Sequence, residues 1–141
     1  MKKRQVVITG AGACGLMAAI MAARNGAAVT VLEQNEKPGK KICATGNGRC
    51  NFSNLARPDD AYRGEHPEFV EDALREFSVE DTIEFFKEIG IYPLNRNGYL
   101  YPRSNQAQSV VDVLCMEAAS LGVKIKTNEQ VTEIKTGTNG K

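Results

Sequence analysis

Hydrophobic residues at the start of the chain form three runs with different periods. Residues 5–9 are a short apolar run that ends at a glycine, which predicts a buried parallel strand. Residues 13–25 are rich in Ala and Met and are followed by Gly26, which predicts a helix that ends at a glycine. Residues 28–33 form a second apolar run. The order predicts a βαβ unit, from which parallel sheets are built.

The remainder of the chain alternates between helical and extended patterns. Ser78 is well placed to cap a helix, because Glu80 and Asp81 would then lie in its first turn, near the positive end of the helix dipole. Residues 95–98 have the composition of a hairpin turn. The predicted helices span residues 68–77, 78–89 and 106–121, the predicted hairpin spans 91–101, and two later strands span 123–127 and 130–135.

These elements predict an α/β fold with an open parallel sheet. Strand, helix and strand come first, followed by an inserted helical and hairpin segment at residues 55–105, and then by a helix and further strands. We therefore expect a Rossmann-like βαβ domain with an incomplete sheet. Phenylalanines recur at helical spacing on the two inserted helices, which predicts packing in the core; they are Phe69, Phe77, Phe85 and Phe86.

Composition narrows the classes of function. A length of 141 residues suits one domain, and 42% hydrophobic and 25% charged residues are ordinary for a globular protein. The net charge of +1 gives no strong field for nucleic acid or an anionic membrane, so we expect neither as a partner. Glycines at positions 10, 12 and 15 interrupt the apolar N-terminal run, which argues against a signal peptide or a membrane span.

Cysteine usage bears on metal binding and location. No two of the four cysteines form a CxxC pair, and the single histidine is His66. A zinc site needs clustered ligands, so we expect no metal. Reduced thiols are typical of the cytosol, which predicts a cytoplasmic protein. The cysteines are Cys14, Cys43, Cys50 and Cys115.

The segment between the first strand and the first helix matches the glycine pattern GxGxxG. Gly10 permits a sharp turn out of the strand, Gly12 leaves room for a pyrophosphate beside the backbone, and Gly15 lets the helix pack on the strand. The N–H groups of the first helical turn would then meet the phosphates. The predicted dinucleotide-binding turn consists of Gly10, Ala11, Gly12, Ala13, Cys14 and Gly15.

Glu33 ends the second predicted strand. An acid at this place accepts hydrogen bonds from the adenosine ribose hydroxyls and repels a 2′-phosphate, which disfavours NADP at this site. The structural alternative is a glycine turn that only joins strand to helix, with Glu33 as a solvated strand end. The agreement of strand, glycines, helix and acid favours the dinucleotide site.

Residues 34–54 form a polar, glycine-rich connection with no helical or strand period. A loop of this length in a compact domain is often functional. Gly46 and Gly48 allow a close backbone approach, and the polar side chains offer directed hydrogen bonds. The segment suits a second wall around an anionic ligand, and a solvated surface loop is the alternative that composition leaves open. Its cationic and amide-bearing members include Lys40, Lys41, Asn47, Arg49 and Asn51.

The segment Gly39–Asn54, with the sequence GKKICATGNGRCNFSN, resembles the signature segment of the BaiN/YhiN-like family. That family comprises bacterial NAD(P)/FAD-dependent oxidoreductases, some described as aminoacetone oxidase-like flavoproteins. Its segment often has the sequence SGGGRCN; here Thr45 replaces the serine and Asn47 replaces a glycine. The stretch Gly98–Ala107 also resembles the family. The GRCN motif is fairly specific, whereas GxGxxG is shared by many families.

The resemblance implies FAD rather than NAD in the first site, with NAD(P)H as a transient electron donor. It implies that the glycine turn and Glu33 hold the ADP half, and that Thr45–Asn51 lies along the cofactor toward the flavin. By analogy with related flavoproteins, the backbone of Val131 would meet the adenine edge. No catalytic residue is implied. The further residues expected to contact the cofactor are Gln34, Lys41, Thr45, Gly46, Asn47, Gly48, Arg49, Cys50 and Asn51.

Members of the resembling family are longer than this chain, which implies that residues 1–141 are the N-terminal FAD-binding domain of a longer flavoprotein. We therefore expect the chain alone to bind FAD weakly and to turn over no small-molecule substrate. Two alternatives stay open: an NAD-dependent dehydrogenase with the same βαβ start, and a nucleotide-binding module without turnover. The hairpin tyrosines either edge a substrate site or pack at the surface; they are Tyr92, Tyr99 and Tyr101.

Overall fold

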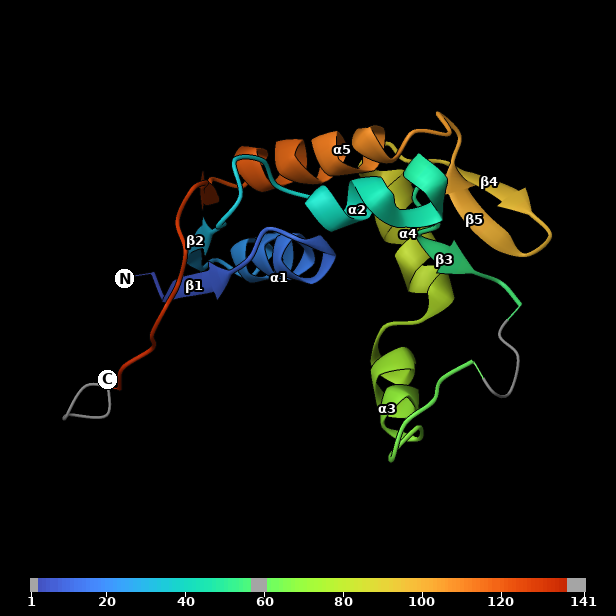
Figure 1. The fold of residues 1–141 in the computed structure, drawn as a ribbon, viewed down its shortest axis with the longest axis horizontal. Coiled ribbons are helices and arrows are strands. Elements are labelled where there is room, and N and C mark those ends of the chain that lie inside the picture. The colour runs from blue at the N-terminus through green and yellow to red at the C-terminus, as the bar shows by residue number, and fades with distance from the viewer. Residues whose placement is uncertain (1–2, 57–60, 137–141) are drawn as a thin grey trace. The chain divides into compact units, whose positions relative to one another are not determined.

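A computed structural model describes residues 3–56 and 61–136 of the chain. The chain divides into two units (Figure 1), and each is described by itself. The first unit runs to Lys41 and resumes at Leu114, and the second comprises Ile42–Val113. Within the described residues, no helix is long and apolar enough to cross a membrane.

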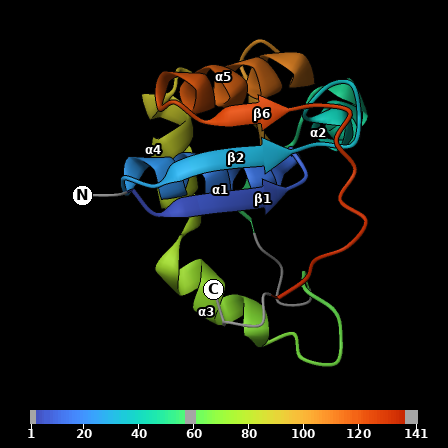
Figure 2. The ribbon, with the colours of Figure 1, turned by 90° about the vertical axis from the view of Figure 1, so that its left-hand side faces the viewer.

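The first unit contains a three-stranded parallel sheet in the order β1-β2-β6 (Figure 2). Strand β2 lies between the other two. In register, Val6 pairs with Val29 and Ile8 with Val31. The prediction of an α/β fold with a Rossmann-like βαβ unit is therefore confirmed. The elements of this unit are β1 (Gln5–Thr9), α1 (Ala13–Arg24), β2 (Ala28–Leu32) and β6 (Lys124–Lys126).

Helix α1 packs on one face of this sheet. Its apolar side chains recur at helical spacing and therefore share one face of the helix, while the side chains of the strands alternate between the two faces of the sheet. Leu16, Ala19 and Ile20 are fully buried, and the two buried positions of β2 are at most 4% exposed. As predicted, a glycine follows the end of the helix: Gly26 has φ +84°, and its N–H donates to the carbonyl of Ala23. Val7, on the other face, is 64% exposed.

The strand predicted at residues 130–135 does not form, so that prediction is wrong. Residues 130–136 carry no helix or strand and are exposed, and Val131 is 37% exposed. The preceding residues are fixed instead by backbone bonds, in which Asn128 and Glu129 donate to the carbonyls of Asn35 and Glu33. The β-branched residues of this segment favour a strand only where a neighbouring strand pairs with it, and no described strand does so here.

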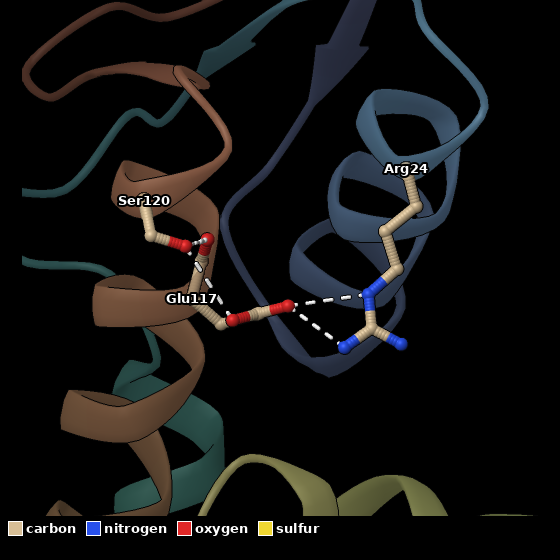
Figure 3. Close-up of polar contacts among 3 residues, drawn as sticks. All are labelled: Arg24, Glu117 and Ser120. Atoms are coloured by element: carbon tan, nitrogen blue, oxygen red, sulfur yellow. Dashed lines mark hydrogen bonds and ion pairs between the residues drawn. The ribbon is translucent and has the colours of Figure 1, made fainter.

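An ion pair connects α1 to α5 (Ala107–Ser120) within the first unit (Figure 3). The Nε and Nη2 atoms of Arg24 both donate to Oε1 of Glu117, at 3.2 and 2.7 Å. Ser120 donates to the carbonyl oxygen of Glu117 at 2.8 Å. The pair orients the last turns of both helices toward each other.

The second unit contains an antiparallel sheet in the order β3-β5-β4. The predicted hairpin is confirmed, and its turn places Asn97 and Gly98 at φ +54° and +91°, as a two-residue Asn-Gly hairpin turn requires. The strands are β3 (Ser53–Asn54), β4 (Pro93–Arg96) and β5 (Tyr99–Pro102).

Residues 34–54 contain short elements that their sequence did not predict. These are α2 (Lys40–Ala44), the 3-10 turn η1 (Thr45–Gly48) and β3. Each is too short to leave a periodic pattern, and left-handed residues at positions 46 and 47 interrupt the helical geometry.

The predicted aromatic core is confirmed for α4 (Val79–Glu88) and wrong for α3 (Phe69–Glu76). Phe85 is 5% exposed, and the ring of Phe86 lies 4.7 Å from that of Phe52. By contrast Phe69 is 81% exposed, and α3 has no buried residue. The predicted cap of α4 is present: Ser78 and Asp81 exchange side-chain and backbone hydrogen bonds in a capping box.

Candidate dinucleotide site

The Gly10–Gly15 turn connects β1 to α1, and two of its glycines are required by the chain itself. Gly10 has φ +87°, in the left-handed region that favours glycine. A Cβ atom on Gly15 would overlap the carbonyl oxygen of Gly10, so only glycine lets α1 approach β1 this closely. These are the structural roles predicted for both positions.

Gly12 differs, because nothing in the chain requires a glycine there. Its φ and ψ of −84° and −170° are extended backbone that any residue adopts, and a Cβ atom would meet no atom within 4 Å. It is the N-cap of α1, so the space beside it adjoins N–H groups that have no partner within the helix. Such a place suits an anionic group that approaches from outside the chain.

Glu33 follows β2 directly and is only 6% exposed. Its Oε2 accepts a hydrogen bond from the N–H of Ala11 at 2.7 Å, and its Oε1 accepts two from Asn35, from the backbone N–H at 2.8 Å and from Nδ2 at 2.6 Å. The alternative of a solvated strand end is therefore wrong. The carboxylate is instead a fixed acceptor beside the glycine turn.

Opposing effects act on the pKa of Glu33. Burial alone would raise it, but the backbone N–H groups of Asn35 and Ala11 and the side-chain amide of Asn35 hold the pKa below its ordinary value of 4.5. The group is thus ionised at neutral pH. Three N–H donors leave lone pairs on both oxygens, so the carboxylate can accept further hydrogen bonds from hydroxyl groups.

Ala11 connects the glycine turn to Glu33 and to Gly39 through its backbone, and it is fully buried. Its N–H is directed at Glu33 rather than at solvent, and its carbonyl accepts the N–H of Gly39 at 2.8 Å. The backbone of Asn128 in turn donates to the carbonyl of Asn35. Hydrogen bonds therefore hold the turn, the acid and the start of the following connection in one arrangement.

The predicted loop Thr45–Asn51 lies in the second unit and is built from left-handed residues. Gly46, Asn47 and Cys50 have φ of +54°, +55° and +59°. A Cβ atom on Gly46 would lie 2.9 Å from the backbone nitrogen of Asn51, so glycine is required there. The loop has a defined backbone conformation, while several of its residues are exposed.

Two side chains of this loop hold it together. Asn51 donates from Nδ2 to the carbonyls of Ser53 and Leu100, which fastens the loop to β3 and β5. Cys50 is buried, and burial raises the pKa of its thiol despite a hydrogen bond with Thr45. Cys50 is thus a neutral packing residue at physiological pH.

Arg49 projects from the same loop toward the hairpin. Its Nε donates to the carbonyl of Gly46 at 3.0 Å, and its guanidinium carbon lies 5.2 Å from the centre of the Tyr101 ring. Among residues 3–56 and 61–136, no hydrogen bond or ion pair is found for its two terminal nitrogens.

The structure brings Gly10–Gly15 and Glu33 together in the first unit, and Thr45–Asn51 lies in the second. Within the glycine turn, Ala13 and Cys14 are exposed on the first turn of α1. The remaining predicted cofactor contacts are exposed as well; they are Gln34, Lys41 and Val131. Sequence reasoning missed Asn35. Its only signal is an amide two residues after the acid, a spacing at which Asn and Asp often bond to nearby backbone.

The sequence of the chain matches a known protein family. The family described as "HI0933-like protein Rossmann domain" matches residues 4–141. The chain belongs to this family. The resemblance to the BaiN/YhiN-like proteins is thereby confirmed, and the HI0933-like domain accounts for the parallel sheet and the glycine turn.

Two curated relatives share the HI0933-like sequence. The chain is 47% identical over 138 residues to a 3-dehydro-bile acid delta(4,6)-reductase of Clostridium scindens, and the match covers 96% of this chain and 34% of the relative. It is 33% identical over 135 residues to a ribosomal RNA dihydrouridine synthase of Escherichia coli, with 95% and 34% covered. The chain spans about a third of the length of these relatives.

Solved structures share the fold of this HI0933-like domain at low sequence identity. A 3-ketosteroid-delta4-(5alpha)-dehydrogenase from Rhodococcus jostii matches with a TM-score of 0.70 at 18% identity, covering 99% of this chain and 41% of the enzyme. A flavocytochrome c3 fumarate reductase matches with a TM-score of 0.67 at 18% identity, covering 96% and 28%. The likeness establishes the Rossmann-like architecture.

Proposed function

We propose that this chain binds FAD through the ADP half of the cofactor and serves a flavin-dependent oxidoreductase. The first-turn N–H groups of α1 would hold the diphosphate, and Glu33 would accept the ribose hydroxyls. The observation that carries the proposal is the open space at Gly12, a position where the chain itself has no need of glycine.

The ionised carboxylate of Glu33 supports the same assignment. It is buried, held on both oxygens by N–H donors, and adjacent to the turn through Ala11. A negative charge fixed there favours ribose hydroxyls and disfavours a 2′-phosphate. The ADP moiety of FAD satisfies this set of groups, and so does that of NAD.

The resemblance of the segment Gly39–Asn54 to flavoproteins favours FAD, and the names of the relatives favour a reduction. One is named a reductase and another a dihydrouridine synthase, and both names describe the reduction of a substrate. When bound, the flavin supplies hydride transfer at its N5 atom. The residues of this chain would bind and orient the adenosine end, with NAD(P)H as the proposed electron donor and a small molecule as substrate. We further propose a cytoplasmic location, because the cysteine usage suits a reducing compartment.

Calorimetric titration with FAD, ADP and NADH tests this proposal. We expect FAD and ADP to bind with similar, weak affinity, and we expect ADP to displace FAD. Glu33→Gln should weaken both by about 1.5–3 kcal/mol, or roughly ten- to a hundredfold, because a charged acceptor is lost. The matched control is Glu129→Gln, an exposed carboxylate. Equal affinities for wild type and Glu33→Gln would reject Glu33 as the ribose acceptor.

Titrations and turnover separate the alternatives. A chain that binds NADH and ADP but not FAD would favour the dehydrogenase. A protein that binds nucleotide, but that shows no NADH or NADPH oxidation even as the longer polypeptide, would favour a binding module without turnover.

A further inference from the structure

Two arginines of the second unit converge on one aromatic ring. Tyr101 lies on β5, and the guanidinium carbon of Arg49, from the loop after η1, is 5.2 Å from the ring centre. Arg96 ends the neighbouring strand β4 and approaches the same ring at 5.9 Å. The ring stabilises each cation through its negative face. The ring does not neutralise the arginines, so both remain cations beside it.

Neither arginine has an acidic partner among the residues that the structure describes. Arg49 donates through Nε to a backbone carbonyl, and its remaining donors are open. Two other cations of the unit do have acidic partners, since Arg75 pairs with Asp72 and Lys87 pairs with Glu84.

The two segments of the chain that carry the ring and the two arginines contain no acidic residue. Residues 42–56 and 89–111 contain the loop and the hairpin, and neither segment has an Asp or a Glu. Their cations are Arg49, Arg96 and Arg103. The acidic residues of the unit lie mainly on α3 and α4 instead. This segregation leaves a local positive potential that an anion would satisfy.

The loop that carries Arg49 is fixed before any ligand arrives. A Cβ atom on Gly46 would lie 3.1 Å from Cε1 of Tyr101, so the loop packs directly on the ring. Asn51 fastens the other end of the loop to the carbonyl of Leu100 on β5. A pre-organised guanidinium loses less freedom on binding than a mobile one.

We propose that Arg49, Tyr101 and Arg96 form a binding site for an oxyanion, a phosphate or carboxylate group. The planar forks of guanidinium groups match these anions in bidentate geometry. The proposal does not rest on the adenosine contacts proposed at Gly10–Gly15 and Glu33. The anion that we expect here belongs to a small molecule that the protein binds.

Nuclear magnetic resonance of the isotope-labelled chain tests this site. Inorganic phosphate and then acetate are added at constant ionic strength while the arginine Nε–H signals are followed. We expect saturable shifts of the Arg49 and Arg96 signals with at least one of the two anions. Arg49→Gln and Arg96→Gln should each weaken binding by about tenfold, because one charge-assisted hydrogen-bonding partner is lost.

Arg75→Gln is the matched control, and it should leave the affinity within about twofold of wild type. Arg96 is exposed, so its variant keeps the fold even if Arg49→Gln does not. No saturable shift with either anion, or unchanged binding in Arg96→Gln, would overturn the proposal.

A repeat of the titration in saturating ADP tests whether the anion belongs to a separate small molecule. We expect the phosphate affinity to stay unchanged. A loss of phosphate affinity would overturn that assignment. Failure of ADP to bind at all would count against the proposed function while leaving the phosphate titration interpretable by itself.

Discussion

Replacement of Gly12 by valine should abolish dinucleotide binding without unfolding the chain. The backbone at Gly12 is extended and its missing side chain would touch nothing within 4 Å, so valine is tolerated sterically in the free protein. Valine is a poorer N-cap than glycine, which costs at most about 1 kcal/mol. In the complex, however, three added carbon atoms would occupy the space where the diphosphate meets the first turn of α1.

The magnitude follows from which contacts are lost. Exclusion of the diphosphate removes at least two charge-assisted hydrogen bonds from the first-turn N–H groups, at about 1.5 kcal/mol each. The affinity for ADP and FAD should therefore fall by more than a hundredfold, or about 2.7 kcal/mol. The measurement is calorimetric titration, accompanied by urea unfolding to monitor stability.

Substitutions at Gly15 and at Gly12 should have opposite effects on stability and binding. A methyl group on Gly15 would overlap the carbonyl oxygen of Gly10, so Gly15→Ala should destabilise the fold by about 1–3 kcal/mol. Gly12→Val should show the opposite pattern, with binding lost and stability kept. Ala18→Val is the control on the exposed face of the same helix. If Gly12→Val bound ADP within about threefold of wild type, a difference under roughly 0.7 kcal/mol, the assignment of this turn would be refuted.

Three further predictions concern the surroundings of the turn. Asn35→Ala should leave Glu33 less well held and should reduce the preference for ADP over 2′-deoxy-ADP, and an unchanged ratio in titrations would contradict this. The pKa of Glu33 is below 4.5 in the folded state, so the unfolded chain takes up the proton first as the pH falls. The free energy of unfolding should therefore decrease as the pH drops below 4.5. Urea unfolding should show a flatter acid dependence for Glu33→Gln. Glu117→Gln should lower stability by about 0.5–1 kcal/mol through loss of the Arg24 pair without altering ADP affinity, and a change in affinity would show that this pair acts on the site.

The sequence predicted most of the first unit because each signal there is local. A buried strand, a glycine turn and a helix closed by Gly26 each leave their own pattern, and the positive φ of Gly10 and the close approach at Gly15 follow from the absence of a side chain. The role of Gly12 was predicted by the same reasoning, and the structure adds that the chain provides no other reason for glycine.

Other features depend on partners that a one-dimensional pattern does not contain. The β-branched residues at 130–135 favour a strand, but a strand needs a neighbour, and none of the described strands pairs with this segment. Phe69 lies on a strongly amphipathic helix and is nonetheless exposed. The bonds from Asn35 to Glu33 and the approach of Arg96 to Tyr101 are contacts of side chains in space, which spacing alone does not reveal.

The central claim is that the Gly10–Gly15 turn and Glu33 bind the ADP half of a dinucleotide, and amide chemical-shift mapping tests it most directly. Isotope-labelled chain is titrated with ADP, and the backbone N–H signals are followed residue by residue. The account predicts saturable shifts concentrated at Gly12, Ala13, Cys14 and Gly15, and at the hydrogen-bonded N–H groups of Ala11 and Asn35 that report on the Glu33 carboxylate. Saturable shifts confined to other parts of the chain, or none at millimolar ADP, would contradict it.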